Sequence, residues 1–296
     1  GRRRRRSGRL PARASASGRR EPFFSSSSVM IKPALTVAVK AARAAGTVIL
    51  RRMARLDAIP VTEKDRFDFA SEVDRQAEAE IIKELKRSYP RHSILAEESG
   101  AQGKGDPTWV IDPLDGTHNY LRGLPHFCVS IAQTVRGQAE IGVIFDPIRN
   151  ELFTASQGGG AFVNDRRMRV AERKTLEGSL LVTGLPFRQR AHLDTQLAML
   201  RDLLTTHQAE DVRRTGSAAL DLAYVAAGRV DAYFEIGLKP WDFAAGQLLV
   251  REAGGRCTDF TGGDGYVHSG NLIAGNLKLV DAMVAALKPH LSNALR

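Results

Sequence analysis

Hydrophobic positions in the first third of the chain recur with helical spacing. A second helical pattern starts near Ser71 and ends before Pro90, and Ser71 and Asp74 resemble a capping box at its start. Asp74 therefore has a structural interpretation as a cap. The first pattern covers residues 33–55 and places on one face the apolar residues Leu35, Val39, Ala42, Ile49 and Met53.

Between residues 127 and 170 the period changes to alternation, which is typical of strands. Gly, Asp-Pro and Asn-Asp turns separate the alternating runs, so the pattern predicts an antiparallel meander. A further short strand is predicted for residues 93–96 and another for residues 109–111. The runs of the meander are 127–135, 139–145, 151–156 and 160–163.

The last third alternates strands and helices. A helix is predicted over residues 192–206, with Leu193, Leu197, Leu200 and Leu204 on its core face. The other predicted elements are a strand at 179–184, a helix from Ser217 towards Gly228, a strand at 231–236, a helix from Trp241 to Gly254, strands at 257–260 and 272–274, and a helix at 277–287. We expect an α+β half over residues 30–175 and an α/β half over 176–296, packed as layers.

The charge of the chain is concentrated at its start. Residues 1–29 hold nine Arg and one Glu, whereas the rest has 34 basic and 32 acidic residues, so the net charge of +10 describes the leader. Its Arg/Ser-rich composition predicts disorder. The composition also fits an organelle transit peptide or a nucleic-acid-binding arm, but we favour an expression leader or translated upstream sequence, with Met30 as the natural start.

Only two cysteines are present, Cys128 and Cys257. Two cysteines exclude a disulfide framework and fit a reducing cytoplasm, where we expect the protein. No apolar run approaches the roughly 20 residues that cross a bilayer, so we expect no membrane association.

The clearest chemical signal is the segment from Trp109 to Thr117. An apolar strand ends in Asp112, Pro113 turns the chain, and Asp115 follows, so both carboxylates can face one point. Two oxygen donors on a rigid turn suit Mg²⁺. Gly116 lets an anion approach the backbone, and Thr117 adds a hydroxyl at a helix start. The structural alternative is a Pro turn followed by an Asp-Gly turn, with Asp115 or Thr117 as a cap.

Other acids could join this site. Glu97 follows the strand at 93–96 and is separated from Asp112 by a Gly-rich loop that could bring it back. Asp242 lies in the first turn of its predicted helix, where a carboxylate also favours the helix dipole. Gly216 and Ser217 stand at another helix start and could be an ordinary cap. Together these groups point to metal-assisted phosphate chemistry.

With these motifs the chain resembles the inositol monophosphatase family of Mg²⁺-dependent, Li⁺-sensitive phosphatases. The resemblance covers residues 31 to about 290 and is strongest to the bacterial extragenic-suppressor inositol-1-monophosphatase branch, as in residues 216–224 and 234–240. It implies a layered αβαβα sandwich and a homodimer. The matching segments are Glu97-Glu98-Ser99, Asp112 to Thr117, and Trp241-Asp242-Phe243-Ala244-Ala245-Gly246.

The resemblance also implies roles for individual residues. Two or three Mg²⁺ ions would be held by Glu97, Asp112, the Leu114 carbonyl, Asp115 and Asp242. Thr117, supported by Asp74 and Glu97, would position the attacking water. The residues expected to contact the phosphate or the alcohol part of the substrate are Gly116, Thr117, Arg213, Gly216, Ser217, Ala218, Glu235 and Asp242. One departure is Ser71, where many relatives have Thr.

The implied activity is hydrolysis of inositol monophosphate or a related sugar-alcohol phosphate. Fructose-bisphosphate and 3′-phosphonucleotide phosphatases of the same superfamily are alternatives. The bacterial branch is also associated with RNA polymerase and transcription antitermination, so a binding role is a further alternative. For that role the sequence offers a basic cluster, Arg166, Arg167, Arg169, Arg173 and Lys174, and the near-neutral body favours a protein partner over nucleic acid.

Overall fold

The computed structural model describes residues 32–54, 61–65 and 68–295. The predictions for residues 1–29 lie outside them. From residue 31 the chain forms one compact unit. Its helices are α1 (Pro33–Met53), α2 (Glu72–Ser88), α3 (Thr117–Leu121), α4 (Leu193–Thr205), α5 (Ala218–Ala226), α6 (Pro240–Glu252), α7 (Tyr266–Ser269) and α8 (Leu277–Leu287).

Eight strands form a mixed sheet in the order β10-β9-β8-β7-β6-β5-β3-β4. The predicted meander is confirmed as β6 to β9, and β3 pairs in parallel with β5. The loop expected after residue 97 instead forms a short hairpin strand, β4. The strands are β3 (Ser93–Ala96), β4 (Gly100–Gln102), β5 (Thr108–Asp115), β6 (Cys128–Val135), β7 (Gln138–Asp146), β8 (Glu151–Ser156), β9 (Gly160–Val163) and β10 (Arg166–Arg167).

A second sheet of five strands has the order β12-β11-β13-β15-β14. β11 is parallel to both of its neighbours, and the remaining pairs are antiparallel. Its strands are β11 (Leu180–Thr183), β12 (Asp211–Arg213), β13 (Ala232–Glu235), β14 (Arg256–Thr258) and β15 (Leu272–Gly275). A separate antiparallel pair joins β1 (Val61–Asp65) and β2 (Asp68–Ser71).

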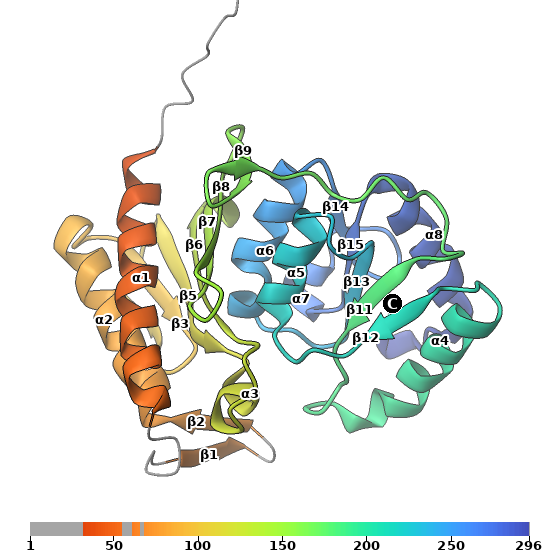
Figure 1. Cartoon of the computed structure of the whole chain (residues 1–296), viewed down its shortest axis with the longest axis horizontal. Helices are drawn as coiled ribbons and strands as arrows, with labels where there is room; N and C mark the ends of the chain where they lie inside the picture. The colour runs from red at the N-terminus through yellow and green to blue at the C-terminus, as the bar shows by residue number, and fades with distance from the viewer. Residues whose placement is uncertain (1–31, 55–60, 66–67, 296) are drawn as a thin grey trace, which may run out of the picture. The chain divides into compact units, whose positions relative to one another are not determined.

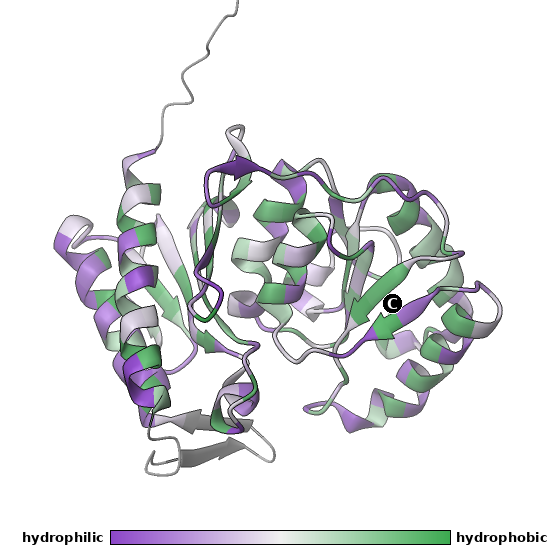
Figure 2. Cartoon of the chain, viewed as in Figure 1, coloured by the Kyte–Doolittle hydropathy of each residue, from purple (hydrophilic) through white to green (hydrophobic). Residues whose placement is uncertain are grey.

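The helices and sheets alternate in five layers, α1/α2, the large sheet, α5/α6, the small sheet, and α4/α8 (Figure 1). The expected α+β, layered αβαβα sandwich is therefore confirmed. The middle helices are apolar around much of their circumference, as Figure 2 shows, because a sheet covers each side. In α5 every residue except Tyr224 is buried.

The outermost helix of the first half, α1, is long and apolar enough to cross a membrane by length and composition alone. In the fold, however, it packs against α2 and the large sheet. Its buried face runs through Ala38, Ala42, Ala45 and Ile49, which are fully covered. The predicted face was right at Ala42 and Ile49, while Leu35, Val39 and Met53 flank it.

The predicted core face of α4 was right only at Leu200, which packs against the core. Leu193, Leu197 and Leu204 are 37%, 50% and 43% exposed. The buried face is instead Gln196, Met199 and Leu203. Gln196 can be buried because its amide donates hydrogen bonds to Thr183 Oγ1 (2.9 Å) and the Gly184 carbonyl (3.1 Å). These two hydrogen bonds hold the Gln196 side of the helix against the core, so most of the leucine stripe faces solvent.

Candidate active site

Residues of the segment from Asp112 to Thr117 line a pocket. Asp112 was expected at the carboxyl end of its strand, but β5 continues to Asp115 and Asp112 lies within it, opposite Ser130 of β6. Asp115 lies opposite Cys128, so three residue steps on β5 match two on β6. Side chains three positions apart normally point to opposite faces of a strand. The bulge inserts one extra residue and lets both carboxylates face the same side.

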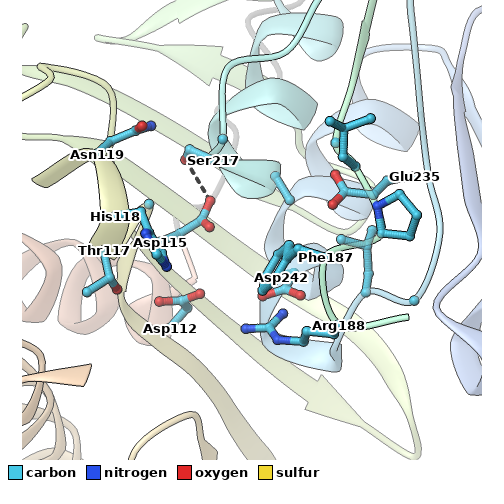
Figure 3. Close-up of a pocket in the computed structure, with 18 of the residues that line it drawn as sticks. Asp112, Asp115, Thr117, His118, Asn119, Phe187, Arg188, Ser217, Glu235 and Asp242 are labelled. Carbon is cyan, nitrogen blue, oxygen red and sulfur yellow. Dashed lines mark hydrogen bonds between the residues drawn. The ribbon is translucent and has the colours of Figure 1, made fainter. Parts of the chain in front are cut away.

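Asp242 completes the acidic cluster from another layer. It lies in the first turn of α6, where its Oδ2 accepts a hydrogen bond of 2.7 Å from the Lys239 amide. Carboxylate oxygens of Asp112, Asp115 and Asp242 lie within 4.8 Å of one another. Figure 3 shows the three side chains around one space. Two sequence motifs 130 positions apart are therefore brought together.

The cluster is electrostatically unfavourable by itself. Burial, together with the charges of Glu97, Asp115 and Asp242, raises the pKa of Asp112 well above its ordinary value. Burial is also the main cause that raises the pKa of Asp115 to about 6, and burial and the Asp115 charge raise that of Asp242. Carboxylates that converge in this way are stabilised by protonation or by a bound cation. The donor set is all oxygen, which fits Mg²⁺.

Thr117 connects the cluster to α2. Its hydroxyl lies 2.8 Å from Asp74 Oδ1 and 3.0 Å from the Leu114 carbonyl, and donates to one or the other. The other Asp74 oxygen accepts from the Ser71 amide (2.8 Å) and hydroxyl, which completes the predicted capping box. Asp74 thus caps α2 and contacts Thr117 at once. The sequence left two roles for Asp74 as alternatives, a helix cap and a partner of Thr117. The structure combines them, because Oδ2 caps α2 and Oδ1 contacts Thr117.

Gly116 and Glu97 owe their positions to the backbone. Gly116 has φ of 95°, and a Cβ there would come within 3.0 Å of the His126 carbonyl, so only glycine is accommodated without strain. Glu97 lines the pocket, and its amide donates to the Ile111 carbonyl at 3.1 Å. Glu78 of α2 accepts from the amides of Glu98 (2.9 Å) and Ser99 (3.0 Å) and so holds the loop after Glu97.

The opposite side of the pocket carries Glu235. Its Oε2 accepts a 2.6 Å hydrogen bond from Tyr233, and burial raises the pKa of Glu235 to about 7. Gly184 faces it, and a Cβ on Gly184 would lie 2.1 Å from the carboxyl carbon. Glycine at 184 therefore makes the space in which Glu235 projects into the pocket.

Most residues expected in the site line this pocket, and two do not. Asp74 lies behind it, in contact with Thr117. Arg213 is exposed and paired with Asp211, so the structure does not bring it into the pocket, where Arg214 lies instead. The expected residues that line it are Glu97, Asp112, Leu114, Asp115, Gly116, Thr117, Gly216, Ser217, Ala218, Glu235 and Asp242.

Sequence reasoning missed the pocket's loop between β11 and α4. Residues 184–189 line it, and the Arg188 side chain points towards Asp112 and Asp242 in Figure 3. It also missed Asn119, whose amide donates to the carbonyls of His126 (2.7 Å) and Thr215 (2.9 Å) and ties the two sides together. A lone Asn or a short loop carries no local pattern, so only the motif Pro-Phe-Arg after a strand end could have drawn attention.

Comparison with known proteins agrees with this geometry. A sequence model of the inositol monophosphatase family matches residues 30–292. The chain is 52% identical over 266 residues to a Salmonella typhimurium protein named Nus factor SuhB, covering 89% of this chain and 99% of that one.

Two solved structures are also similar to the chain. The extragenic suppressor protein suhB of Bartonella henselae matches with a TM-score of 0.84 and 43% identity, over 88% of this chain and all of that one. The inositol monophosphatase of Anabaena matches with a TM-score of 0.77 and 40% identity, over 86% of this chain and 95% of that one. The chain therefore belongs to the inositol monophosphatase family.

Proposed function

We propose that the protein is a Mg²⁺-dependent phosphomonoesterase that hydrolyses inositol monophosphate or a related sugar-alcohol phosphate. The observation that carries the proposal is the convergence of Asp112, Asp115 and Asp242 beside the Thr117–Asp74 hydrogen bond. Family membership supports the reaction class. The substrate class rests on the resemblance and on the polar groups opposite the acids.

The acidic cluster suits a cation site. Glu97, Asp112, the Leu114 carbonyl, Asp115 and Asp242 all line the pocket and would hold the two or three ions. Bound there, Mg²⁺ would favour ionisation of a water and stabilise negative charge on the leaving oxygen. The same cation would offset the repulsion that raises the pKa of the buried carboxyls.

Thr117 is suited to orient a water molecule. An ionised Asp74 is an acceptor only, so it takes the single hydroxyl proton of Thr117. The lone pairs of Thr117 Oγ1 then face outwards and can accept a hydrogen bond from water. Asp74 is held in turn by the amide and hydroxyl of Ser71. Asp74 would thus act through Thr117 and not touch the substrate.

The remaining groups suit a phosphorylated polyol. Gly116 and Thr117 begin α3 and would hold the phosphate through their amides. Gly216 and Ala218, at the start of α5, line the neighbouring wall. Glu235 has one oxygen bonded to Tyr233, which leaves the other for a substrate hydroxyl.

Phosphate release tests the proposal directly. Inositol monophosphate should be hydrolysed with Mg²⁺ and not in EDTA, and Li⁺ should inhibit. Equal release in both conditions would refute a metal-dependent reaction. A panel with fructose bisphosphate and a 3′-phosphonucleotide separates the two superfamily alternatives, because those substrates carry a second charged group or a base.

A second function is a binding role in transcription, which the name Nus factor of the 52% identical relative supports. In this chain Arg166 and Arg167 form the exposed edge strand β10, and Arg169 follows. We propose this edge for contact with RNA polymerase or antitermination proteins. Arg173 contributes less because it pairs with Asp231 at 3.4 Å.

Pull-down with a chain that starts at Met30 tests this role, since the Arg-rich leader would bind acidic partners whatever the fold does. Retention of transcription proteins that survives Asp115→Asn but not Arg166→Glu/Arg167→Glu would support a separate binding surface. Retention only with residues 1–29 present would refute it.

We also propose a homodimer, as the resemblance implies. Leu193, Leu197, Leu200 and Leu204 recur at the 3.5-residue spacing that suits helix–helix packing, and three of them are exposed. Light scattering should find a dimer. Leu197→Lys/Leu204→Lys should yield monomers if this face of α4 is the contact, and a dimer that persists would place the contact elsewhere.

A further inference from the structure

Three donors converge on one oxygen of Asp115. The Ser217 hydroxyl donates to Oδ2 at 2.6 Å, as Figure 3 shows, and the Ala219 amide donates to the same oxygen at 2.8 Å. The Cys128 thiol lies 3.9 Å from it. Ser217 and Cys128 are almost completely buried, whereas Asp115 is half-buried beside the pocket.

These contacts join distant parts of the fold. Asp115 ends β5 in the large sheet, whereas Ser217 and Ala219 lie 102 and 104 positions later at the start of α5. The first amides of a helix lack partners within the helix and need an external acceptor. Ser217 stands at the N-cap position, but its side chain makes no capping bond to α5. The Asp115 carboxylate supplies the acceptor instead.

These contacts decide which oxygen of Asp115 is available to a metal ion. Two short hydrogen bonds occupy Oδ2 and fix the plane of the carboxylate. Oδ1 accepts none of these bonds, and one ligand oxygen of Asp115 lies within 4.8 Å of a ligand oxygen of Asp112 and of Asp242. A carboxylate fixed in this way presents one lone pair in a constant direction. Ligands oriented by such neighbouring bonds bind metal more tightly than free ones.

We propose that Ser217 is a positioning residue for the metal site: its hydroxyl, with the Ala219 amide, commits Oδ2 of Asp115 to the protein and directs Oδ1 to the cation. The inference rests on the proposed function, because it needs Asp115 to be a ligand. It also revises the role of Ser217, which the sequence placed against the substrate. A hydroxyl that donates to Asp115 at 2.6 Å has no proton left for a substrate oxygen.

Mn²⁺ binding to the full chain, measured by electron paramagnetic resonance without substrate, tests the proposal. Ser217→Ala should weaken Mn²⁺ binding about tenfold. Ser217→Thr keeps the hydroxyl and should recover most of the lost affinity. The matched control is Ser179→Ala, a buried serine outside the pocket whose hydroxyl donates to the Leu176 carbonyl at 2.6 Å. It should bind Mn²⁺ as the wild type does.

Wild-type Mn²⁺ affinity in Ser217→Ala, with a raised KM, would overturn the proposal and return Ser217 to the substrate. If Ser217→Ala does not fold, Ser217→Cys carries the same prediction, since a thiol is similar in size but a weaker donor. Asp115→Asn tests separately whether Asp115 is a metal ligand, on which the role of Ser217 depends. It should lose Mn²⁺ affinity, and unchanged binding there would overturn the metal assignment of Asp115 and, with it, the role of Ser217.

Discussion

One wall of the pocket carries Asp112, Asp115 and Thr117 and comes from β5 and the first turn of α3. The wall that faces it comes from the loop at 184–189, the end of β13 at Glu235 and the loop at 236–238. We call them the acidic wall and the facing wall. Each acid of the first has bonds to backbone or buried side chains that fix it. The facing wall contributes Glu235, Arg188 and backbone from loops.

This difference separates two tasks. Charges that repel one another must be held by a rigid frame if they are to bind a cation, and a bulged central strand provides such a frame. A wall that recognises the rest of a substrate can be made of loops, which vary more readily. We therefore expect substitutions in the acidic wall, or at Asp242 of α6, to change metal affinity and turnover. Substitutions in the facing wall should change KM.

The largest effect should come from Asp242→Asn. Asn can still accept the Lys239 amide that Asp242 caps, so the fold should persist, but one negative charge leaves the cation site. We expect phosphate release to fall by about 100-fold or more and Mg²⁺ affinity to drop. Wild-type activity at limiting Mg²⁺ would contradict the assignment of Asp242 as a ligand.

Asp74→Asn should act on turnover alone. The amide can still accept from Ser71 or Thr117, but it no longer carries the charge that draws the Thr117 proton. We expect kcat to fall by about 100-fold, the range of general acid–base contributions, with Mn²⁺ affinity close to that of the wild type. A parallel loss of metal affinity would show that Asp74 belongs to the metal site itself.

Glu235→Gln examines the facing wall. Above pH 7, where Glu235 is ionised, we expect KM for inositol monophosphate to rise roughly 10-fold, since a hydrogen bond to a charged acceptor is replaced by a neutral one, while Mn²⁺ affinity stays constant. Arg213→Ala is the matched control, because Arg213 is exposed and paired with Asp211 outside the pocket. A KM that rises with Arg213→Ala and not with Glu235→Gln would reverse our placement of the two residues.

The smallest effect is a pH dependence of stability. Burial raises the pKa of Asp115 to about 6, and such a raised pKa stabilises the fold at low pH and loses this contribution as pH rises through the folded value. In EDTA the free energy of unfolding should therefore fall between about pH 4 and pH 7. Mg²⁺ should flatten this trend, because a cation favours the ionised carboxyls.

Urea unfolding at several pH values, with and without Mg²⁺, measures this dependence. Asp115→Asn in EDTA should show a weaker trend than the wild type, since it lacks one of the titrating groups. The same slope in both proteins would mean that the pKa of Asp115 does not differ between the folded metal-free state and the unfolded state.

Local patterns in the sequence were sufficient where a contact lies within a few residues. The capping box of Ser71 and Asp74, the helix start at Asp242, the meander of β6 to β9 and the helix at 277–287 were all predicted and are present. The acidic motifs identified the three carboxylates that converge in the pocket. Such contacts depend on neighbours in the chain, so the residue types alone specify them.

The α4 face shows where local patterns stop being sufficient. Two stripes of that helix have helical spacing, and the more apolar one, Leu193 to Leu204, is exposed except at Leu200. Gln196 is buried because Thr183, at the end of β11, and the Gly184 carbonyl that follows accept its protons. No periodicity within residues 192–206 contains that information.

The sequence by itself determined which residues could bind a cation and a phosphate, because carboxylates, a glycine and a threonine hydroxyl in one short motif have few other uses together. Only the tertiary structure decided how they meet. The bulge in β5 turns Asp112 and Asp115 to one side, and layer packing brings Asp242 within 4.8 Å and Ser217 within 2.6 Å of the cluster. Pairing between β5 and β6 sets the register that turns the two carboxylates to one side. Packing between the layers determines which helix start lies next to the end of each strand.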